Sequence, residues 1–167
     1  VRNFGATVDL IDTSKVGRNE RVAEIAAIKP EAYAASAYDD DFVIAGNSNS
    51  FSANDANLII KVDKNGSIQW SKQYSASVSG VSSIIQISSG KYIAVGYGSQ
   101  GGFTKATAFC TDATGTVIWA KAYNTLGSYW EATDVIKTLD GKLVISGFAQ
   151  ESGDYNPFIF KIDTNGN

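Results

Sequence analysis

The sequence KVDKNGSIQWSKQY (residues 61–74) returns with substitutions as CTDATGTVIWAKAY (residues 110–123). Its first half returns once more as KIDTNGN (residues 161–167). The matching aspartates and glycines of the three copies are about 50 positions apart: Asp63, Asp112 and Asp163, followed by Gly66, Gly115 and Gly166. Self-similarity at a fixed period of this length indicates a repeat architecture.

A second marker has the same period. The segments FVIAG, YIAVG and LVISG end in Gly46, Gly96 and Gly147. Apolar runs bounded by Asp, Asn and Gly predict four short strands in each copy, which in the second copy span residues 82–88, 92–96, 106–112 and 116–123. The Asp-x-x-Gly segment predicts the turn between the third and fourth strands, because Asp can accept backbone N–H bonds and Gly can adopt a positive φ.

The second strand of each copy is apolar on both faces, as in residues 42–45, so it must be covered on both sides. Four-stranded antiparallel units of this kind predict an all-β fold, a β-propeller. We expect a divergent N-terminal segment (residues 1–31) that could form strands of a preceding blade, then blade 1 (32–80), blade 2 (81–131) and an incomplete blade 3 (132–167). Because closed rings normally take about four to eight blades, the expectation is a partial propeller.

The amino-acid composition of the chain excludes several classes of function. The 167 residues carry a formal net charge of −3, so there is no electrostatic footprint for nucleic acid, and no apolar run is long enough to span a membrane. Histidine is absent and Cys110 is the single cysteine, which removes the commonest general base, an internal disulfide and a cysteine-based zinc site. Abundant Gly, Ser, Thr, Asn and Tyr predict an exported protein, at the cell surface or extracellular. The absence of Met predicts a processed chain or a piece of a longer one.

These residues resemble the β-propeller repeats of bacterial and archaeal surface proteins and lipoproteins. Their blades read roughly D-G-G-Y-I-V-A-G and then L-I-K-L-D-x-N-G-x-I-x-W-x-K-x-Y, which matches residues 90–96 and 60–70. The resemblance covers roughly residues 32–167. The segment TDATGTVIW is also distantly similar to the repeat of quinoprotein propellers, one residue short. The resemblance implies a fold, while its function is left open, since one scaffold hosts many activities.

Few residues predict catalysis or metal binding. Asp63 with Asn65 offers oxygen ligands for calcium, but a capped hairpin turn accounts for the same pattern. Glu131 and Asp134 form the best-placed carboxylate pair for glycosidic chemistry, yet the sequence shows neither a fixed separation nor a raised pKa. No nucleophile motif is present. We expect no catalytic residues, no metal site and no cofactor.

Aromatic residues outside the strand pattern are the candidates for ligand binding. We expect the loops at residues 47–56, 75–80, 97–105, 124–131 and 148–156 to share one face of a propeller, and they also carry Phe51 and Phe148. Aromatic rings with polar partners suit carbohydrate or protein contacts. The alternative is that the rings only fold their own loops. The predicted ligand-binding residues are Phe103, Tyr129, Trp130, Glu131 and Tyr155.

The function expected from the sequence is therefore a non-catalytic surface or extracellular module for binding, adhesion or assembly into a larger structure, such as a filament or other oligomer. The expected partner is another protein or further copies of the chain, with a glycan as a further option. Two rival hypotheses remain, a carbohydrate-binding, lectin-like propeller and a fragment of a quinoprotein-like enzyme.

Overall fold

The computed structural model describes residues 31–38, 41–48, 56–74, 79–88, 90–100, 102–123, 129–151 and 153–167. Residues 1–30, most of the expected N-terminal segment, and Phe51 lie outside them. The described residues form no helix and eleven strands: β1 (Glu31–Tyr38), β2 (Asp41–Ser48), β3 (Ala56–Val62), β4 (Ile68–Tyr74), β5 (Gly80–Ser88), β6 (Lys91–Gln100), β7 (Phe103–Thr111), β8 (Val117–Tyr123), β9 (Tyr129–Lys137), β10 (Leu143–Glu151) and β11 (Asp154–Ile162).

The strands form two sheets. The first has the order β1-β2-β3-β4, and the second joins seven strands in the order β11-β10-β9-β7-β6-β5, with β8 paired to β7. Every pairing is antiparallel except one parallel pair between β7 and β9, Thr104 with Tyr129. The expected all-β antiparallel structure is confirmed. Separate four-stranded units were expected, whereas the second sheet is continuous, and no closed ring is present among the described strands.

The continuity arises because the hairpins are longer than the sequence suggested. Strands β6 and β7 stay paired as far as Gln100 with Phe103, and β10 and β11 as far as Glu151 with Asp154. Gly102 and Gly153 have φ values of 80° and 98° in these tight turns, a conformation that glycine adopts without strain. Much of residues 97–105, 129–131 and 148–156, expected as loops, therefore lies in strands.

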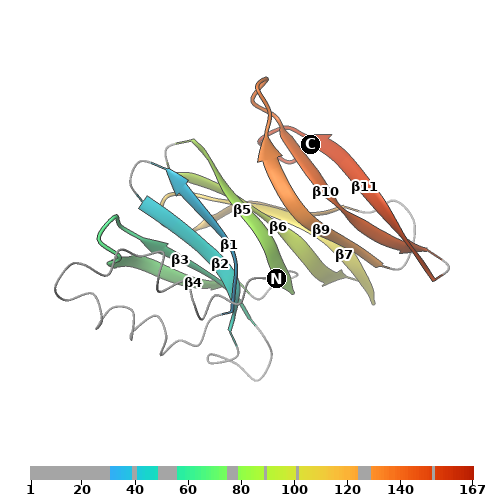
Figure 1. Ribbon diagram of the computed structural model, residues 1–167, viewed down its shortest axis with the longest axis horizontal. Helices are drawn as coiled ribbons and strands as arrows, with labels where there is room; N and C mark the ends of the chain where they lie inside the picture. Colours follow the sequence, from blue (N-terminus) through green and yellow to red (C-terminus); the bar gives the residue numbers. More distant parts are fainter. Residues whose placement is uncertain are drawn as a thin grey trace.

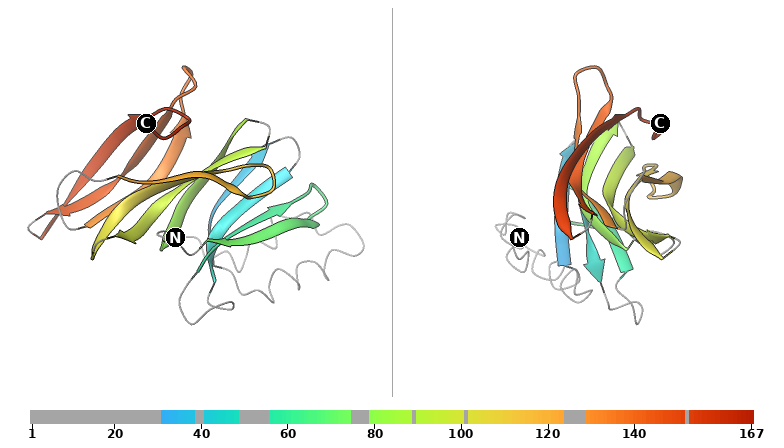
Figure 2. Two further views of the ribbon diagram at one scale, coloured as in Figure 1. Left: turned by 180° about the vertical axis from the view of Figure 1, so that it is seen from behind. Right: turned by 90° about the vertical axis from the view of Figure 1, so that its right-hand side faces the viewer.

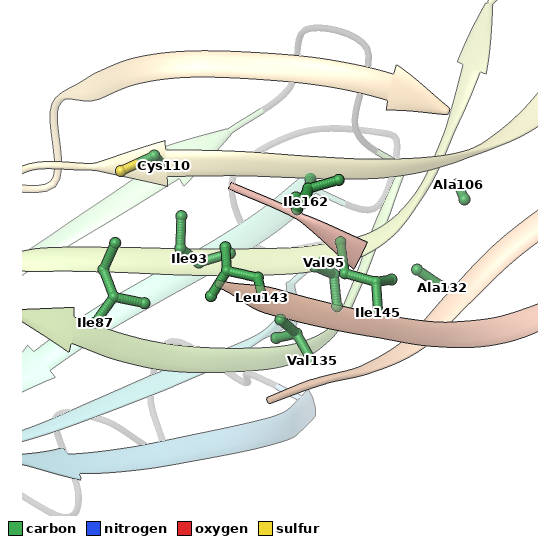
Figure 3. Close-up of a cluster of buried hydrophobic side chains, with 11 residues drawn as sticks. Ile87, Ile93, Val95, Ala106, Cys110, Ala132, Val135, Leu143, Ile145 and Ile162 are labelled. Carbon is green, nitrogen blue, oxygen red and sulfur yellow. The ribbon is translucent and has the colours of Figure 1, made fainter. Parts of the chain in front are cut away.

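Three strand groups follow one another across the molecule: the first is β1–β4, the second β5–β8 and the third β9–β11 (Figures 1 and 2). Strand β5 contacts both β1 and β9, so the first strands of the groups are neighbours. Apolar clusters fill the two junctions. Val43, Ala45 and Ile59 pack against the second group, and Figure 3 shows residues of the second and third groups packed together, among them Ile93, Val95, Leu143 and Ile145.

Glycine ends each of the three motifs FVIAG, YIAVG and LVISG for a steric reason. The first strand of each group carries one extra residue in a bulge beside this glycine. A Cβ atom on Gly96 would lie 2.0 Å from the carbonyl oxygen of Gly80, and one on Gly147 would lie 2.0 Å from that of Glu131. No side chain fits there, so the sequence marker records a close approach of two backbones.

The Asp-x-x-Gly segments form capped hairpin turns. Asp63 Oδ1 accepts hydrogen bonds from the amides of Asn65 and Ser67, each 2.8 Å long. Asp112 and Asp163 accept the equivalent bonds. Hydrogen bonds lower the pKa of both carboxyls, chiefly that from the Thr114 hydroxyl for Asp112 and that from the Asn167 amide for Asp163. The carboxylates are therefore engaged by their own turns.

The Trp, Lys and Tyr side chains of the repeated Trp-x-Lys-x-Tyr motif donate hydrogen bonds to the turn of the following strand group. Trp70 Nε1 donates to the carbonyl of Ala113 at 2.8 Å, Lys72 Nζ to Thr116 Oγ1 at 3.2 Å and the Tyr74 hydroxyl to the carbonyl of Gly115 at 2.6 Å. The tryptophan therefore contacts the neighbouring strand group. We call this set of contacts the clasp.

The clasp recurs between the second and third groups. Trp119 Nε1 donates to the carbonyl of Thr164 at 3.0 Å, Lys121 Nζ to Asn167 Oδ1 at 2.6 Å and the Tyr123 hydroxyl to the carbonyl of Gly166 at 2.9 Å. A Cβ atom on Gly166 would lie 3.0 Å from the Trp119 ring. The same three side chains therefore hold the same kind of turn at both junctions.

Gly147→Ala should lower the free energy of unfolding by about 2–3 kcal/mol, because the added Cβ meets a backbone oxygen that cannot move alone. Gly141→Asn is the control, since Gly141 has open space and Asn tolerates the positive φ at this turn. Urea denaturation measures both variants. Equal stability of the two variants would contradict the steric explanation.

Tyr123→Phe should lower the free energy of unfolding by about 1 kcal/mol at neutral pH, through loss of the clasp hydrogen bond. Burial and then the charge of Asp163 raise the pKa of Tyr123 from 10.0 to about 12. Because the folded state favours the neutral hydroxyl, its contribution is complete below pH 10 and disappears as the pH rises to about 12. Denaturation across this range should show a shallower alkaline decline in the variant, and identical slopes would count against the assignment.

Candidate functional site

The five predicted ligand-binding residues lie at one end of the seven-stranded sheet. Tyr129, Trp130 and Glu131 begin β9, Phe103 begins β7 and Tyr155 lies near the start of β11. The pair Thr104 with Tyr129 brings the starts of β7 and β9 together. Sequence reasoning thus gathered residues that are neighbours in space, although they belong to strands.

Strand register then separates these residues between the two faces of the sheet. Gln150 of β10 pairs with both Tyr129 and Tyr155, and Phe148 pairs with Glu131 and Pro157. Residues paired in one row share a face, and alternate residues along a strand return to it. We use the name aromatic surface for the side chains that meet on this face: Tyr129, Glu131, Phe148 and Tyr155.

Direct contacts hold the aromatic surface together. The ring centroids of Tyr129 and Phe148 are 6.1 Å apart with nearly parallel planes, and those of Phe148 and Tyr155 are 5.5 Å apart in an edge-to-face arrangement. The Tyr129 hydroxyl donates to Glu131 Oε2 at 2.7 Å. Tyr155 is 64% exposed, so its ring offers an apolar surface to solvent beside a carboxylate.

Trp130 and Phe103 have other surroundings. Trp130 follows Tyr129 in the strand and points to the opposite face, where its ring stacks on Phe158 at 4.8 Å and packs against the core. Phe103 is 52% exposed at the start of β7, and because Thr104 pairs with Tyr129, Phe103 lies on the face of the sheet opposite the aromatic surface. The structure therefore brings together Tyr129, Glu131 and Tyr155, adds Phe148 and places Trp130 in the packing between strand groups.

The electrostatics of the aromatic surface keep the Tyr129 hydroxyl neutral. Burial raises the pKa of Tyr129, and the hydrogen bond to Glu131 and the nearby charges of Glu131, Tyr97 and Tyr155 raise it further. At neutral pH the hydroxyl is thus a donor and Glu131 an acceptor. Such an arrangement orients a carboxylate next to rings, which suits recognition of a partner with apolar and hydrogen-bonding groups.

The carboxylate pair considered for glycosidic chemistry is divided. Glu131 accepts from Tyr129, whereas Asp134 Oδ1 accepts the Ser83 hydroxyl at 2.8 Å and the amide of Val135 at 2.9 Å. The two carboxylates thus have separate hydrogen-bond partners, on the third strand group itself and across the junction with the second. Within the described part of the chain, no group of three or more His, Cys, Asp or Glu side chains could hold a metal ion.

Cys110 is buried with 2% of its surface exposed, and burial raises the pKa of its thiol. A neutral, enclosed thiol is a poor nucleophile. The residue packs in the cluster between the second and third strand groups as a small apolar side chain (Figure 3).

The aromatic surface belongs to a larger face of the third strand group. Alternation along β9, β10 and β11 places further apolar side chains on it, and Ile136 and Ile159 are 55% and 73% exposed. We define the outward face by five residues: Ile136, Val144, Phe148, Tyr155 and Ile159.

Corresponding positions in the other two groups are buried. By register, Ile159 corresponds to Ile59 and Ala108, and these are 0% and 1% exposed. Likewise Val144, which is half-buried, corresponds to the fully enclosed Val43 and Ile93. In the first and second groups the next group covers these positions, whereas no described strand covers this face of the third group.

No protein-family model matches this chain, and no curated protein is significantly similar to it. Among the residues that the structure describes, no helix is long and apolar enough to cross a membrane.

Glu131→Gln should lower the pKa of Tyr129, because the substitution removes a negative charge that disfavours tyrosinate at 2.7 Å. Trp130→Phe is the matched control, since Trp130 lies on the other face of β9. Titration of tyrosine Cζ signals by NMR measures both. A Tyr129 titration that is unchanged in Glu131→Gln would contradict the coupling.

Proposed function

We propose that this chain is a non-catalytic module of the β-propeller type that serves binding or assembly through the outward face. Two observations support the propeller interpretation. The pairing of β5–β8 repeats that of β1–β4 nearly residue for residue, and among the described residues the strand pairing between the second and third groups consists of the single pair Thr104 with Tyr129. The seven-stranded sheet is thus a four-stranded and a three-stranded unit in edge contact.

The exposure of the outward face is the observation that carries the proposed function. Ile159 is 73% exposed where its counterparts Ile59 and Ala108 are buried. Contiguous exposed apolar surface is unfavourable in water and commonly marks a contact surface. The face therefore favours an occupant with an apolar β surface, such as another protein or a second copy of this chain.

The amino-acid composition is the basis for the proposed cellular location of such an assembly. Gly, Ser, Thr, Asn and Tyr are abundant, and the single cysteine is buried and unpaired. We place the protein outside the cell or at its surface, where adhesion or filament formation would use repeated units of this kind.

Carbohydrate binding is the second candidate, and the aromatic surface favours it. Tyr155 presents an exposed ring and Glu131 a carboxylate fixed by Tyr129. Rings of this kind pack against the apolar faces of sugars, while carboxylates accept hydroxyl hydrogen bonds.

The double substitution Tyr155→Ser with Ile159→Lys should abolish self-association of the chain, because it removes apolar area and adds charge on the outward face. The free energy of unfolding should change by no more than about 0.5 kcal/mol, as usual for surface positions. Sedimentation velocity across a concentration series measures association.

Leu139→Lys is the control, since Leu139 is fully exposed in the turn between β9 and β10, outside the five residues of the outward face, and should leave association unchanged. An equal effect of both changes would contradict the proposal. A glycan array separates the second candidate: specific sugar binding that is lost in Tyr155→Ala and retained in Trp130→Phe would favour the lectin interpretation.

A further inference from the structure

Strand β11 is an edge strand with backbone groups facing outward. Among the described residues it pairs only with β10. The amide of Asp163 donates to the carbonyl of Asn167, the bond that closes the turn toward the outer side of β11. Because backbone directions alternate along a strand, the amides and carbonyls of Lys161 and Ile159 point to the same outer side.

The equivalent edges of the first two strand groups are occupied. The amides of Asp63 and Asp112 make the same turn bond, and there the outer side of β3 carries β4 and that of β7 carries β8. The registers agree: Trp70 pairs with Lys61 and Lys72 with Ile59, while Trp119 pairs with Cys110 and Lys121 with Ala108. Both pairings also contain a bulge one residue before the tryptophan.

From this correspondence we infer that the outer edge of β11 binds an extended protein segment with Ile or Val two positions before the Trp of a W-x-K-x-Y motif, running antiparallel, with its Trp opposite Lys161 and its Lys opposite Ile159. The inference deepens the proposed assembly role and rests on it, since it names the strand that a partner would contribute. It concerns the sheet edge, whereas the outward face is a side-chain surface.

The side chains along this edge suit such a strand. In the first strand group Lys61 stands opposite Trp70 and forms an ion pair with Asp41 at 2.9 Å. Lys161 forms an ion pair with Asp140 at 2.8 Å. The charge at this position is therefore already paired, and a tryptophan can cover it without leaving an isolated buried cation.

Pro157 sets the extent of the pairing. By alternation its nitrogen faces the outer side, so the missing N–H removes no bond to β10. Its counterparts Asn57 and Ala106 pair with the tyrosines of the motif, Tyr74 and Tyr123. The added strand should thus be held at Lys161 and Ile159, with the tyrosine end held by fewer backbone bonds.

The test uses a fluorescent peptide with the sequence of residues 115–124, GTVIWAKAYN, and the full chain. Fluorescence anisotropy measures affinity, and hydrogen exchange locates the contact. Binding should slow exchange at the Ile159 and Lys161 amides and leave exchange in β7 unchanged.

Two N-methylated peptides form the matched pair. The amide of the peptide lysine should face β11, as that of Lys121 faces β7, and the amide of the preceding alanine should face away. Methylation at lysine should therefore weaken binding about tenfold or more, because a backbone bond is lost and its partner is left unpaired. Methylation at the alanine should leave the affinity within about twofold.

Two variants of the chain at Ile159 make the same comparison on β11 instead of on the peptide. Ile159→Pro removes the outward amide and should abolish binding, whereas Ile159→Ala keeps the amide and should retain it. No binding of the unmodified peptide, equal weakening by both methylations, or protection at another strand would each overturn the inference. Loss of peptide binding with association through the outward face intact would reject the strand site alone, and the reverse result would reject the proposed function alone.

Discussion

Trp119, Lys121 and Tyr123 extend from β8 onto a turn about 45 positions further along the chain, and their hydrogen bonds end on backbone and side-chain oxygens of that turn. The turn can receive them because Asp163 shapes it and Gly166 leaves room for the indole ring. The same three-point contact joins β4 to the turn between β7 and β8. Since each contact spans a junction, it fixes the position of one strand group relative to the next. The clasp sets the geometry within which the apolar clusters pack.

Within that geometry, polar and apolar roles are divided between the ends and the middle of the strands. The middle of β6 is buried on both faces, with Tyr92 and Ala94 facing the first group and Ile93 and Val95 facing the third. At one end of the strands, the aspartates of the turns and the residues of the clasp form hydrogen bonds with backbone amides and carbonyls. The aromatic surface occupies the other end of the third group. A binding surface can therefore vary at that end while the clasp and the central packing are preserved.

The sequence predicted the parts of the fold that depend on local chemistry. The period located the turns at Gly115 and Gly166, and the Asp-x-x-Gly pattern predicted how these turns are capped. It also placed Phe103, Tyr129 and Tyr155 at one end. These features follow from turn geometry and from residue types that recur at fixed spacing.

Strand extent and pairing across groups could not be read in this way. The segment GYGSQGG looks like a loop because Gly and Ser are common in turns, yet most of it continues β6. Treating residues 129–131 as a loop also grouped Trp130 with Tyr129, although neighbours in a strand face opposite sides. The single pair of Thr104 with Tyr129 has no local signal, since it depends on where two groups meet.

The clasp also has a consequence for folding order. The side-chain hydrogen bonds between strand groups, in the clasp and between Ser83 and Asp134, join residues 41 to 51 positions apart, so each group depends on its immediate neighbour in sequence. Structure can then grow along the chain one group at a time, with each completed turn offering the docking point for the strand before it. Among the described groups the second has a neighbour on both sides, whereas the first and the third have a neighbour on one side only. Fraying should accordingly begin in the outer groups and move inward, which makes the order of unfolding a property of position in the array.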